Sequence, residues 1–324
     1  MSLPFRNDKD ANNLYTIAFY NLENLFNTSD DKHTLDRDFT PKGKKKWTER
    51  RYRKKLNNLS NTISRIGKET ALKPPVLVGI VEIENAEVVQ DLLATKNLND
   101  YKYDYIHFES PDERGIDTAL LYIKSHFEVI ETRPIPLLLY DEDGNRDTTR
   151  DILYVYGKLN QEKVHVFVNH WPSRRSGSEE TSSKRILAAE TILNEMDKIE
   201  KDYVDPKYVV MGDFNDDPTA KSIQLILSSK PLYNPMESLL SDKRGSANYK
   251  RKWSLFDQIM ISKSFFNYSL ETHSYSNANI YDSHSLKEWK GKYAGNPFRT
   301  YVGTKYLGGS SDHFPVYIQL EYNP

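Results

Sequence analysis

Short apolar segments recur along the whole chain, separated by polar stretches, and most of them have the length of a β-strand. The run at 76–83 is apolar at nearly every position, which is typical of a strand buried on both faces of its sheet. At 316–320, apolar residues alternate with others, which predicts one buried face. Together these patterns predict strands over residues 14–20, 76–83, 101–108, 119–122, 152–159, 164–168, 208–211, 255–261 and 316–320.

Four other segments carry apolar residues three or four positions apart, the spacing of one face of a helix. The first covers residues 49–68 and is followed by Pro74 and Pro75, which stop any continuation. The others begin near Ala86, follow the polar loop at 173–178, and cover 219–227. The residues expected to face inward are Leu56, Leu59, Ile63 and Ile66 in the first helix and Ile186, Ala189, Leu193 and Met196 in the helix after the polar loop.

Strands and helices mix from one end of the chain to the other, with no linker and no break in composition. This mixture predicts an α/β fold, and polar clusters at both ends point to one domain over residues 10–324. We expect residues 1–9 to be a disordered terminal segment. Residues 27–47 are expected to form a charged loop, and 270–310 a long loop region rich in aromatic residues.

Composition excludes several kinds of function without selecting one. The formal net charge is −1, so a polyanion would have to meet a local patch rather than an overall positive field. Without Cys there is no disulfide, no thiolate metal site and no Cys nucleophile. The sequence has no apolar run long enough to span a membrane and no signal peptide. Its beginning is compatible with a native start and equally with removal of an export signal.

Acidic and amide side chains directly follow several of the predicted strands. Glu82 ends the strand at 76–83, where a buried carboxylate must be paired with Lys or Arg or must hold a cation. Mg2+ prefers oxygen ligands and takes few carboxylates, so Glu82 together with Asp312 would suit it. Asp213 and Asn215 would share one face of an extended segment, although a simple turn is the alternative. Asp213 could take a proton from an attacking water, and Asn215 could donate to a phosphate oxygen.

Two histidines occupy similar places beside predicted strands, each next to an Asn or an Asp. A single His is commonly a structural imidazole, but His170 and His313 together favour a catalytic role. Asp257 lies within an apolar run, where an unpaired carboxylate would be costly. A buried Asp that orients a His resolves this cost, so we pair Asp257 with His313.

Basic and aromatic residues suggest where a substrate could bind. Arg114, Arg174 and Arg175 are candidates for binding phosphate oxygens, with solvated surface positions as the alternative. The Lys- and Arg-rich segment 42–55 is either a track for a phosphate backbone or a solvated loop and helix face. The aromatic segment 270–310 could stack bases or cover the core.

Six short runs, spread over nearly the whole chain, resemble the motifs of the endonuclease/exonuclease/phosphatase superfamily, which includes pancreatic DNase I. The resemblance implies a DNase I-like four-layer α/β sandwich, with two mixed β-sheets packed face to face and helices outside. It also implies Mg2+-dependent cleavage of a phosphate ester, with Mn2+ as a substitute. The runs are Phe19-Tyr20-Asn21-Leu22-Glu23-Asn24, Val81-Glu82-Ile83-Glu84-Asn85, Val168-Asn169-His170-Trp171, Gly212-Asp213-Phe214-Asn215, Phe256-Asp257-Gln258-Ile259 and Ser311-Asp312-His313 with Pro315.

The same resemblance implies roles for individual residues. Glu82 would be the principal metal ligand and Asp312 a second or outer ligand. Gln258 and the continuation from Trp171 to Arg175 depart from the family pattern and bear on substrate contacts. The other implied roles are positioning of metal or phosphate by Asn21, activation of water by Asp213, phosphate binding by Asn215, transition-state stabilisation by His170 and His313, and fixing of His313 by Asp257. Asp117 is a further candidate to orient His170.

Three functions remain open at the level of sequence. A nuclease is favoured by the likeness to bacterial nucleases and by segment 42–55. A phosphatase or phosphodiesterase acting on a phospholipid, inositol phosphate or other small phosphoester would use the same core. A non-catalytic binding module is the third, which the full set of expected site residues disfavours. We expect a monomer, and the bacterial likeness is compatible with export from the cell.

Overall fold

The computed structural model describes residues 12–141, 143–174, 177, 179 and 181–324. Two of the sequence predictions, disorder of residues 1–9 and phosphate binding by Arg175, concern positions outside these described residues. The assignment of residues 10–324 to one domain stays a prediction.

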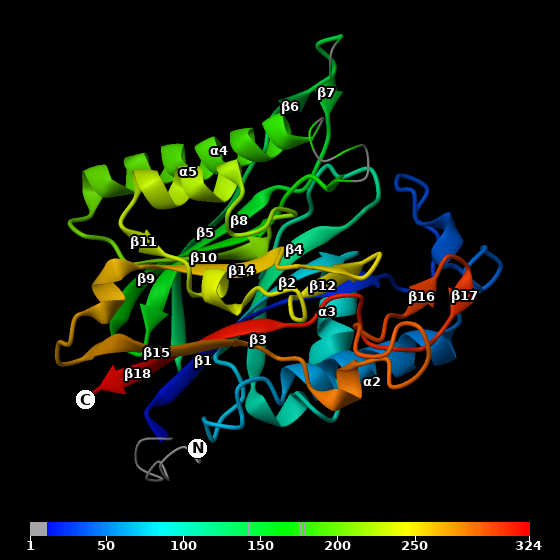
Figure 1. Cartoon of the computed structure of the whole chain (residues 1–324), viewed down its shortest axis with the longest axis horizontal. Coiled ribbons are helices and arrows are strands. Elements are labelled where there is room, and N and C mark those ends of the chain that lie inside the picture. The colour runs from blue at the N-terminus through cyan, green and yellow to red at the C-terminus, as the bar shows by residue number, and fades with distance from the viewer. Residues whose placement is uncertain (1–11, 142, 175–176, 178, 180) are drawn as a thin grey trace.

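Two six-stranded mixed sheets dominate the structure (Figure 1). The first has the order β15 (Thr272–Ile280), β18 (Val316–Asn323), β1 (Leu14–Leu25), β2 (Leu77–Ile83), β4 (Asp117–Ile123) and β3 (Tyr103–His107). The second has the order β11 (Leu232–Tyr233), β14 (Asp257–Ser262), β10 (Tyr208–Asp213), β9 (Glu162–His170), β8 (Ile152–Leu159) and β5 (Phe127–Ile135). Strands β1 and β2 are parallel, as are β9 and β10, whereas the other neighbours are antiparallel.

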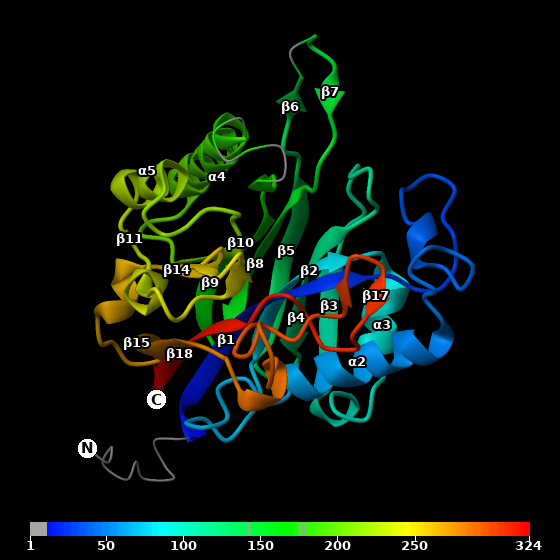
Figure 2. The same ribbon diagram turned by 45° about the vertical axis from the view of Figure 1, so that its right-hand side comes forward.

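Helices cover the outer faces of both sheets, which gives four layers (Figure 2). Helices α2 (Glu49–Ile63) and α3 (Ala86–Leu93) lie over the first sheet, and α4 (Ser182–Asp202) and α5 (Lys221–Ser229) lie over the second. The expected DNase I-like sandwich, with two mixed sheets inside and helices outside, is therefore confirmed.

A search of the helices in the described part of the chain found none with the length and apolar character of a membrane span.

Short elements connect these layers. Two-stranded hairpins are formed by β6 (Leu139–Tyr140) with β7 (Arg146–Asp147), by β12 (Ala247–Tyr249) with β13 (Lys252–Ser254), and by β16 (Tyr301–Val302) with β17 (Lys305–Tyr306). Single 3-10 turns are η1 (Arg37–Phe39), η2 (Asn99–Tyr101), η4 (Pro235–Leu239), η5 (Lys263–Phe266) and η6 (His284–Leu286).

The alternation of side chains along the central strands builds two apolar cores. In β9, Val166 and Val168 enter the core between the sheets, whereas Phe167 packs under α4. In β10, Met211 points between the sheets and Val210 points toward the helices. Because both faces of these strands are buried, they read as continuous apolar runs in the sequence.

Two predictions about secondary structure were wrong. Residues 270–310 are not a loop throughout, because β15 pairs with β18 at the edge of the first sheet. An edge strand of half-buried polar residues gives no apolar signal, and the same reason explains why β5 was not predicted. In α4, Ala189 and Met196 are buried as expected and Leu193 is half-buried against the same core. Ala188 and Ile192 complete the inner face, and Ile186 is only half-buried.

Candidate active site

Strand register places three of the predicted residues side by side at one end of the second sheet. Asp213 is paired with His170 on β9 and with Asp257 on β14. All three are buried, with 2%, 4% and 0% of their surface exposed. Buried polar residues in such a row need partners, and the neighbouring first sheet supplies them.

Three contacts join this row to residues of the first sheet and of the segment that leads into β18. The Asn21 side-chain amide donates to Asp213 Oδ2 over 2.9 Å, and Asp257 Oδ2 lies 2.6 Å from His313 Nδ1. His170 Nε2 is 3.8 Å from Glu82 Oε1. Six residues predicted from sequence therefore meet where the ends of the two sheets approach one another.

The strand ends that carry the site depart from regular β geometry. Glu23 and Asn24 on β1, Glu82 on β2 and Asn215 after β10 all have positive φ, between 50° and 61°. Pairing between β1 and β2 shifts register at this point, as expected for a bulge. Non-glycine residues in this conformation are strained and concentrate at functional sites.

Glu82 is held in place by the end of β1 and by Arg114. The Asn24 N–H donates to Glu82 Oε2 over 2.9 Å, and Arg114 Nη2 lies 3.7 Å from Oε1. Arg114 also donates to the Asn24 side-chain oxygen. With 12% of its side chain exposed, Glu82 presents a fixed carboxylate at the rim of the site.

Asp213 and Asn215 form a compact turn after β10. The Asn215 N–H donates to Asp213 Oδ1 over 3.0 Å, and the Asn215 side chain donates to the Trp171 carbonyl over 3.0 Å. Burial and the nearby Asp257 carboxylate raise the pKa of Asp213 to about 6. Such a carboxylate is well suited to accept a proton near neutral pH.

His313 is a cationic partner for these carboxylates. Burial disfavours its protonated form, but the attraction of Asp257 and of Asp213 is stronger, so the pKa of His313 lies well above its ordinary value. Asp312 lies beside it, with Oδ1 4.0 Å from His313 Nε2 and Oδ2 2.8 Å from Arg299 Nη2. The predicted Asp257–His313 pair is therefore present in the structure.

Arg174 is engaged by the protein chain itself. Its Nε donates to the Asn215 carbonyl over 2.7 Å, and its Nη2 pairs with Asp216 over 2.7 Å. The guanidinium also lies over the Phe256 ring. These contacts support the Asn215 turn, and phosphate binding by Arg174 stays a prediction.

Sequence reasoning missed a buried network under the β1 end. Lys55 is only 1% exposed. Its ammonium group donates to the Glu23 carbonyl and to Thr300 Oγ1, the latter over 2.8 Å. The Glu23 carboxylate accepts from the N–H groups of Thr300 and Tyr301. The available signal was the place of Lys55 in α2, between Tyr52, Leu56 and Leu59 on the buried face.

The donor atoms fit a hard divalent cation. Glu23, Asp312 and Glu82 are all close enough to raise the pKa of Lys55, although burial lowers it overall. Burial and the Asp312 charge raise the pKa of Glu23 to about 7. Carboxylates crowded in this way favour a cation, and oxygen ligands suit Mg2+ or Mn2+.

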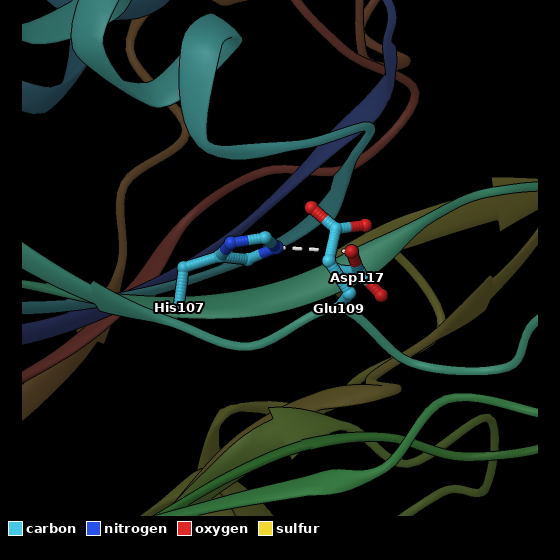
Figure 3. Close-up of side chains that lie close together, drawn as sticks. All are labelled: His107, Glu109 and Asp117. Atoms are coloured by element: carbon cyan, nitrogen blue, oxygen red, sulfur yellow. Dashed lines mark hydrogen bonds and ion pairs between the residues drawn. The ribbon is translucent and has the colours of Figure 1, made fainter. Parts of the chain in front are cut away.

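Among the described residues, two groups of three have ligand atoms close enough to hold a metal. The group Asp213, Asp257 and His313 better suits proton transfer, because His313 Nδ1 is bonded to Asp257 and the raised pKa of His313 disfavours the neutral imidazole that a metal requires. In the other group, shown in Figure 3, His107 Nε2 lies 2.9 Å from Asp117 and Glu109 is exposed. The second Asp117 oxygen accepts from Ser110, so His107 and Ser110 are partners of the two Asp117 oxygens. Orientation of His170 by Asp117 stays a prediction.

The basic and aromatic segments each divide into buried and exposed parts. In segment 42–55, Lys55 is buried and Lys45 donates to the Gly303 carbonyl, whereas Lys42, Lys44 and Arg50 are exposed. In segment 270–310, Tyr281 and Leu286 are buried while Trp289 and Tyr293 are 69% and 52% exposed. Burial of Tyr281 and Leu286 agrees with a segment that covers part of the core. A phosphate-backbone track along 42–55 and base stacking by 270–310 stay predictions.

Comparison with known proteins agrees with this architecture. The family model described as "Endonuclease/Exonuclease/phosphatase family" matches residues 16–322. Curated protein sequences give no significant match.

Three solved structures that are similar in fold share between 16% and 18% of their sequence with this chain. An endonuclease/exonuclease/phosphatase family protein from Bacteroides thetaiotaomicron is 18% identical, with a TM-score of 0.58 over 96% of this chain and 95% of that one. A mannosyl-6-phosphatase from the same organism is 17% identical, with a TM-score of 0.57 over 95% and 100%. TDP2 from D. rerio, complexed with a single-strand DNA product, is 16% identical, with a TM-score of 0.55 over 95% and 99%.

Proposed function

The chain belongs to the endonuclease/exonuclease/phosphatase family, and we propose that it is a Mg2+-dependent phosphoesterase that acts as a nuclease. The activities named in the family description all cleave phosphoester bonds. The observation that carries the proposal is the meeting of Asp213, His313 and Glu82 at the ends of two sheets, with supporting partners for each.

In the proposed reaction, Asp213 takes a proton from water as the water oxygen attacks phosphorus. The new P–O bond forms as the opposite P–O ester bond breaks, in line with the attack, and the departing oxygen takes up a proton from solvent. Asn21 and the Asn215 N–H hold the Asp213 carboxylate in one orientation during this step. A fixed general base of this kind contributes about 10²- to 10⁴-fold to rate.

His313, His170 and Asn215 would stabilise the negative charge that develops on the phosphoryl oxygens. Asp257 holds His313 and raises its pKa, so the imidazolium would offer a charged donor without reorganisation. Asn215 gives one amide hydrogen to Trp171, and a primary amide has a second to offer.

Glu82, with Asp312 as second or outer ligand, would hold the cation. When bound, Mg2+ would neutralise charge on the non-bridging and leaving oxygens. Asn24 and Arg114 fix Glu82 for this purpose from two directions.

The choice of a nuclease rests on exposed basic side chains in segment 42–55. Lys42 and Lys44 are exposed in the loop before α2, and Arg50 is exposed in the first turn of α2, the helix that also carries Lys55 into the buried network. Such side chains suit a phosphate backbone. A phosphatase or phosphodiesterase for a small phosphoester is the second candidate, supported by the lack of an overall positive charge.

Parallel assays on plasmid DNA, RNA and a small phosphodiester test the substrate, with Asp213→Asn as the inactive control. We expect cleavage of nucleic acid by the wild-type protein and loss of that cleavage in the variant. Hydrolysis of the small ester alone would overturn the nuclease and retain the phosphoesterase.

A further inference from the structure

Lys55 and Glu82 contact opposite ends of the same peptide unit. The Glu23 carbonyl oxygen accepts from the Lys55 ammonium, and the Asn24 N–H of that peptide bond donates to Glu82 Oε2 over 2.9 Å. We propose that Lys55 is a positioning residue for Glu82, acting through the peptide group between Glu23 and Asn24. This inference rests on the proposed function, in which Glu82 is the principal metal ligand.

The local backbone supports this arrangement. Glu23 and Asn24 have φ values of 51° and 55°, which turn the end of β1 away from regular pairing with β2. The turn directs the carbonyl toward α2 and the N–H toward Glu82, whose own φ is 61°. Strained residues persist only where surrounding contacts hold them, and Lys55 supplies one such contact.

Burial gives the interaction its strength. Lys55 is 1% exposed and Glu23 is 8% exposed, so solvent has little access to the bond between them. A cation on a carbonyl polarises the peptide group, so its N–H becomes a stronger donor. The carboxylate of Glu82 would thereby be held in one orientation before a metal arrives.

Thr300 holds Lys55 in this position. Its Oγ1 accepts from the Lys55 ammonium over 2.8 Å, and its N–H donates to the Glu23 carboxylate over 2.6 Å. Thr300 is itself 2% exposed, so the network is closed to solvent on this side. Groups that orient a metal ligand commonly change metal affinity about 10- to 100-fold when they are removed.

The affinity for a metal distinguishes two effects of Lys55: orientation of Glu82, and repulsion of the cation by the lysine charge. Lys55→Met removes a positive charge near the proposed metal site, so charge repulsion alone predicts tighter cation binding. Positioning predicts weaker binding, by about 10- to 100-fold. Lys54→Met, an exposed lysine on the same helix, is the matched control and should bind Mn2+ as the wild type does.

The experiment combines calorimetric Mn2+ titration with the amide NMR spectrum of the metal-free protein. In folded Lys55→Met, we expect weaker Mn2+ binding and an upfield shift of the Asn24 amide proton. Thr300→Val keeps the lysine charge and should change both in the same direction by less, so it carries the test if Lys55→Met does not fold. Unchanged or tighter Mn2+ binding, or an unmoved Asn24 resonance, would overturn the inference. Failure of the wild type to bind Mn2+ would instead refute the proposed function. The Asn24 shift would still show whether Lys55 polarises the peptide group between Glu23 and Asn24.

Discussion

Asn21 and Asp213 are 192 residues apart in the chain, yet the Asn21 amide donates to Asp213 Oδ2 over 2.9 Å. Asn21 lies on β1 of the first sheet and Asp213 ends β10 of the second. The bond therefore joins the two sheets at the site and stabilises the charged form of Asp213.

The ionisation of Asp213 should appear in the pH dependence of catalysis. Its pKa is raised to about 6 by burial and Asp257, so the carboxylate is protonated and inactive below that pH. We expect kcat/KM to rise as pH increases through about 6 or, with metal bound, somewhat lower. In Asn21→Ala, which loses a donor to the charged form, the rise should move to higher pH. A kcat/KM that falls between pH 5 and 7 would contradict the role of Asp213.

Substitution of His313 should reduce catalysis without unfolding the protein. His313→Ala removes a charged donor and should lower kcat by about 10²- to 10⁴-fold. Asp257→Asn removes the carboxylate that raises the pKa of His313. The loss of activity at alkaline pH should therefore begin at a lower pH in this variant than in the wild type. Circular dichroism checks the fold of both variants. Near-wild-type turnover of His313→Ala would rule out its assigned role.

Gly212 allows β9 and β10 to approach closely next to two site residues. A Cβ at this position would lie 2.5 Å from the Asn169 carbonyl oxygen, a contact that requires backbone movement. Gly212→Ala should cost about 1–3 kcal/mol of stability and separate His170 from Asp213. Denaturant unfolding and kcat measure the two effects. An unchanged midpoint and unchanged activity would show that the strands can adjust freely.

His165 should make stability depend on pH through a group far from the catalytic chemistry. Burial lowers the pKa of His165 to about 4, and Tyr154 Oη lies 2.8 Å from its Nδ1. Below the unfolded-state pKa of about 6.5, the unfolded chain binds a proton that the native protein does not. Stability should therefore fall as pH decreases from about 6.5 to about 4, by up to about 3 kcal/mol from this residue.

The control for this effect is His165→Phe, which keeps a ring beside Tyr156 and does not titrate. The difference in unfolding free energy between pH 7 and pH 4.5 should be smaller in the variant. Equal differences in the two proteins would show that His165 ionises normally in the native state.

Sequence patterns predicted the central strands and the Asp257–His313 pair, because apolar runs and buried carboxylates impose strong physical constraints. The four-layer α/β fold was predicted from the family resemblance. The patterns did not predict β5 or β15, because these strands lie at the edges of their sheets and their half-buried residues show no apolar periodicity. They also missed the role of Lys55, since a charged residue on an apolar helix face can point either inward or along the surface. Contacts such as Lys55 with Thr300 join residues 245 positions apart, and local patterns carry no information about them.

The central claim is that Glu82 holds a catalytic divalent cation. The most direct measurement is hydrolysis of plasmid DNA and of a small phosphodiester with Mg2+, with Mn2+ and with chelator, by wild-type protein and by Glu82→Ala. We expect activity only with metal, and an activity in Glu82→Ala lower by about 10²-fold or more at the same metal concentration. Full activity in the presence of chelator, or a Glu82→Ala variant with the wild-type dependence on Mg2+, would contradict this assignment.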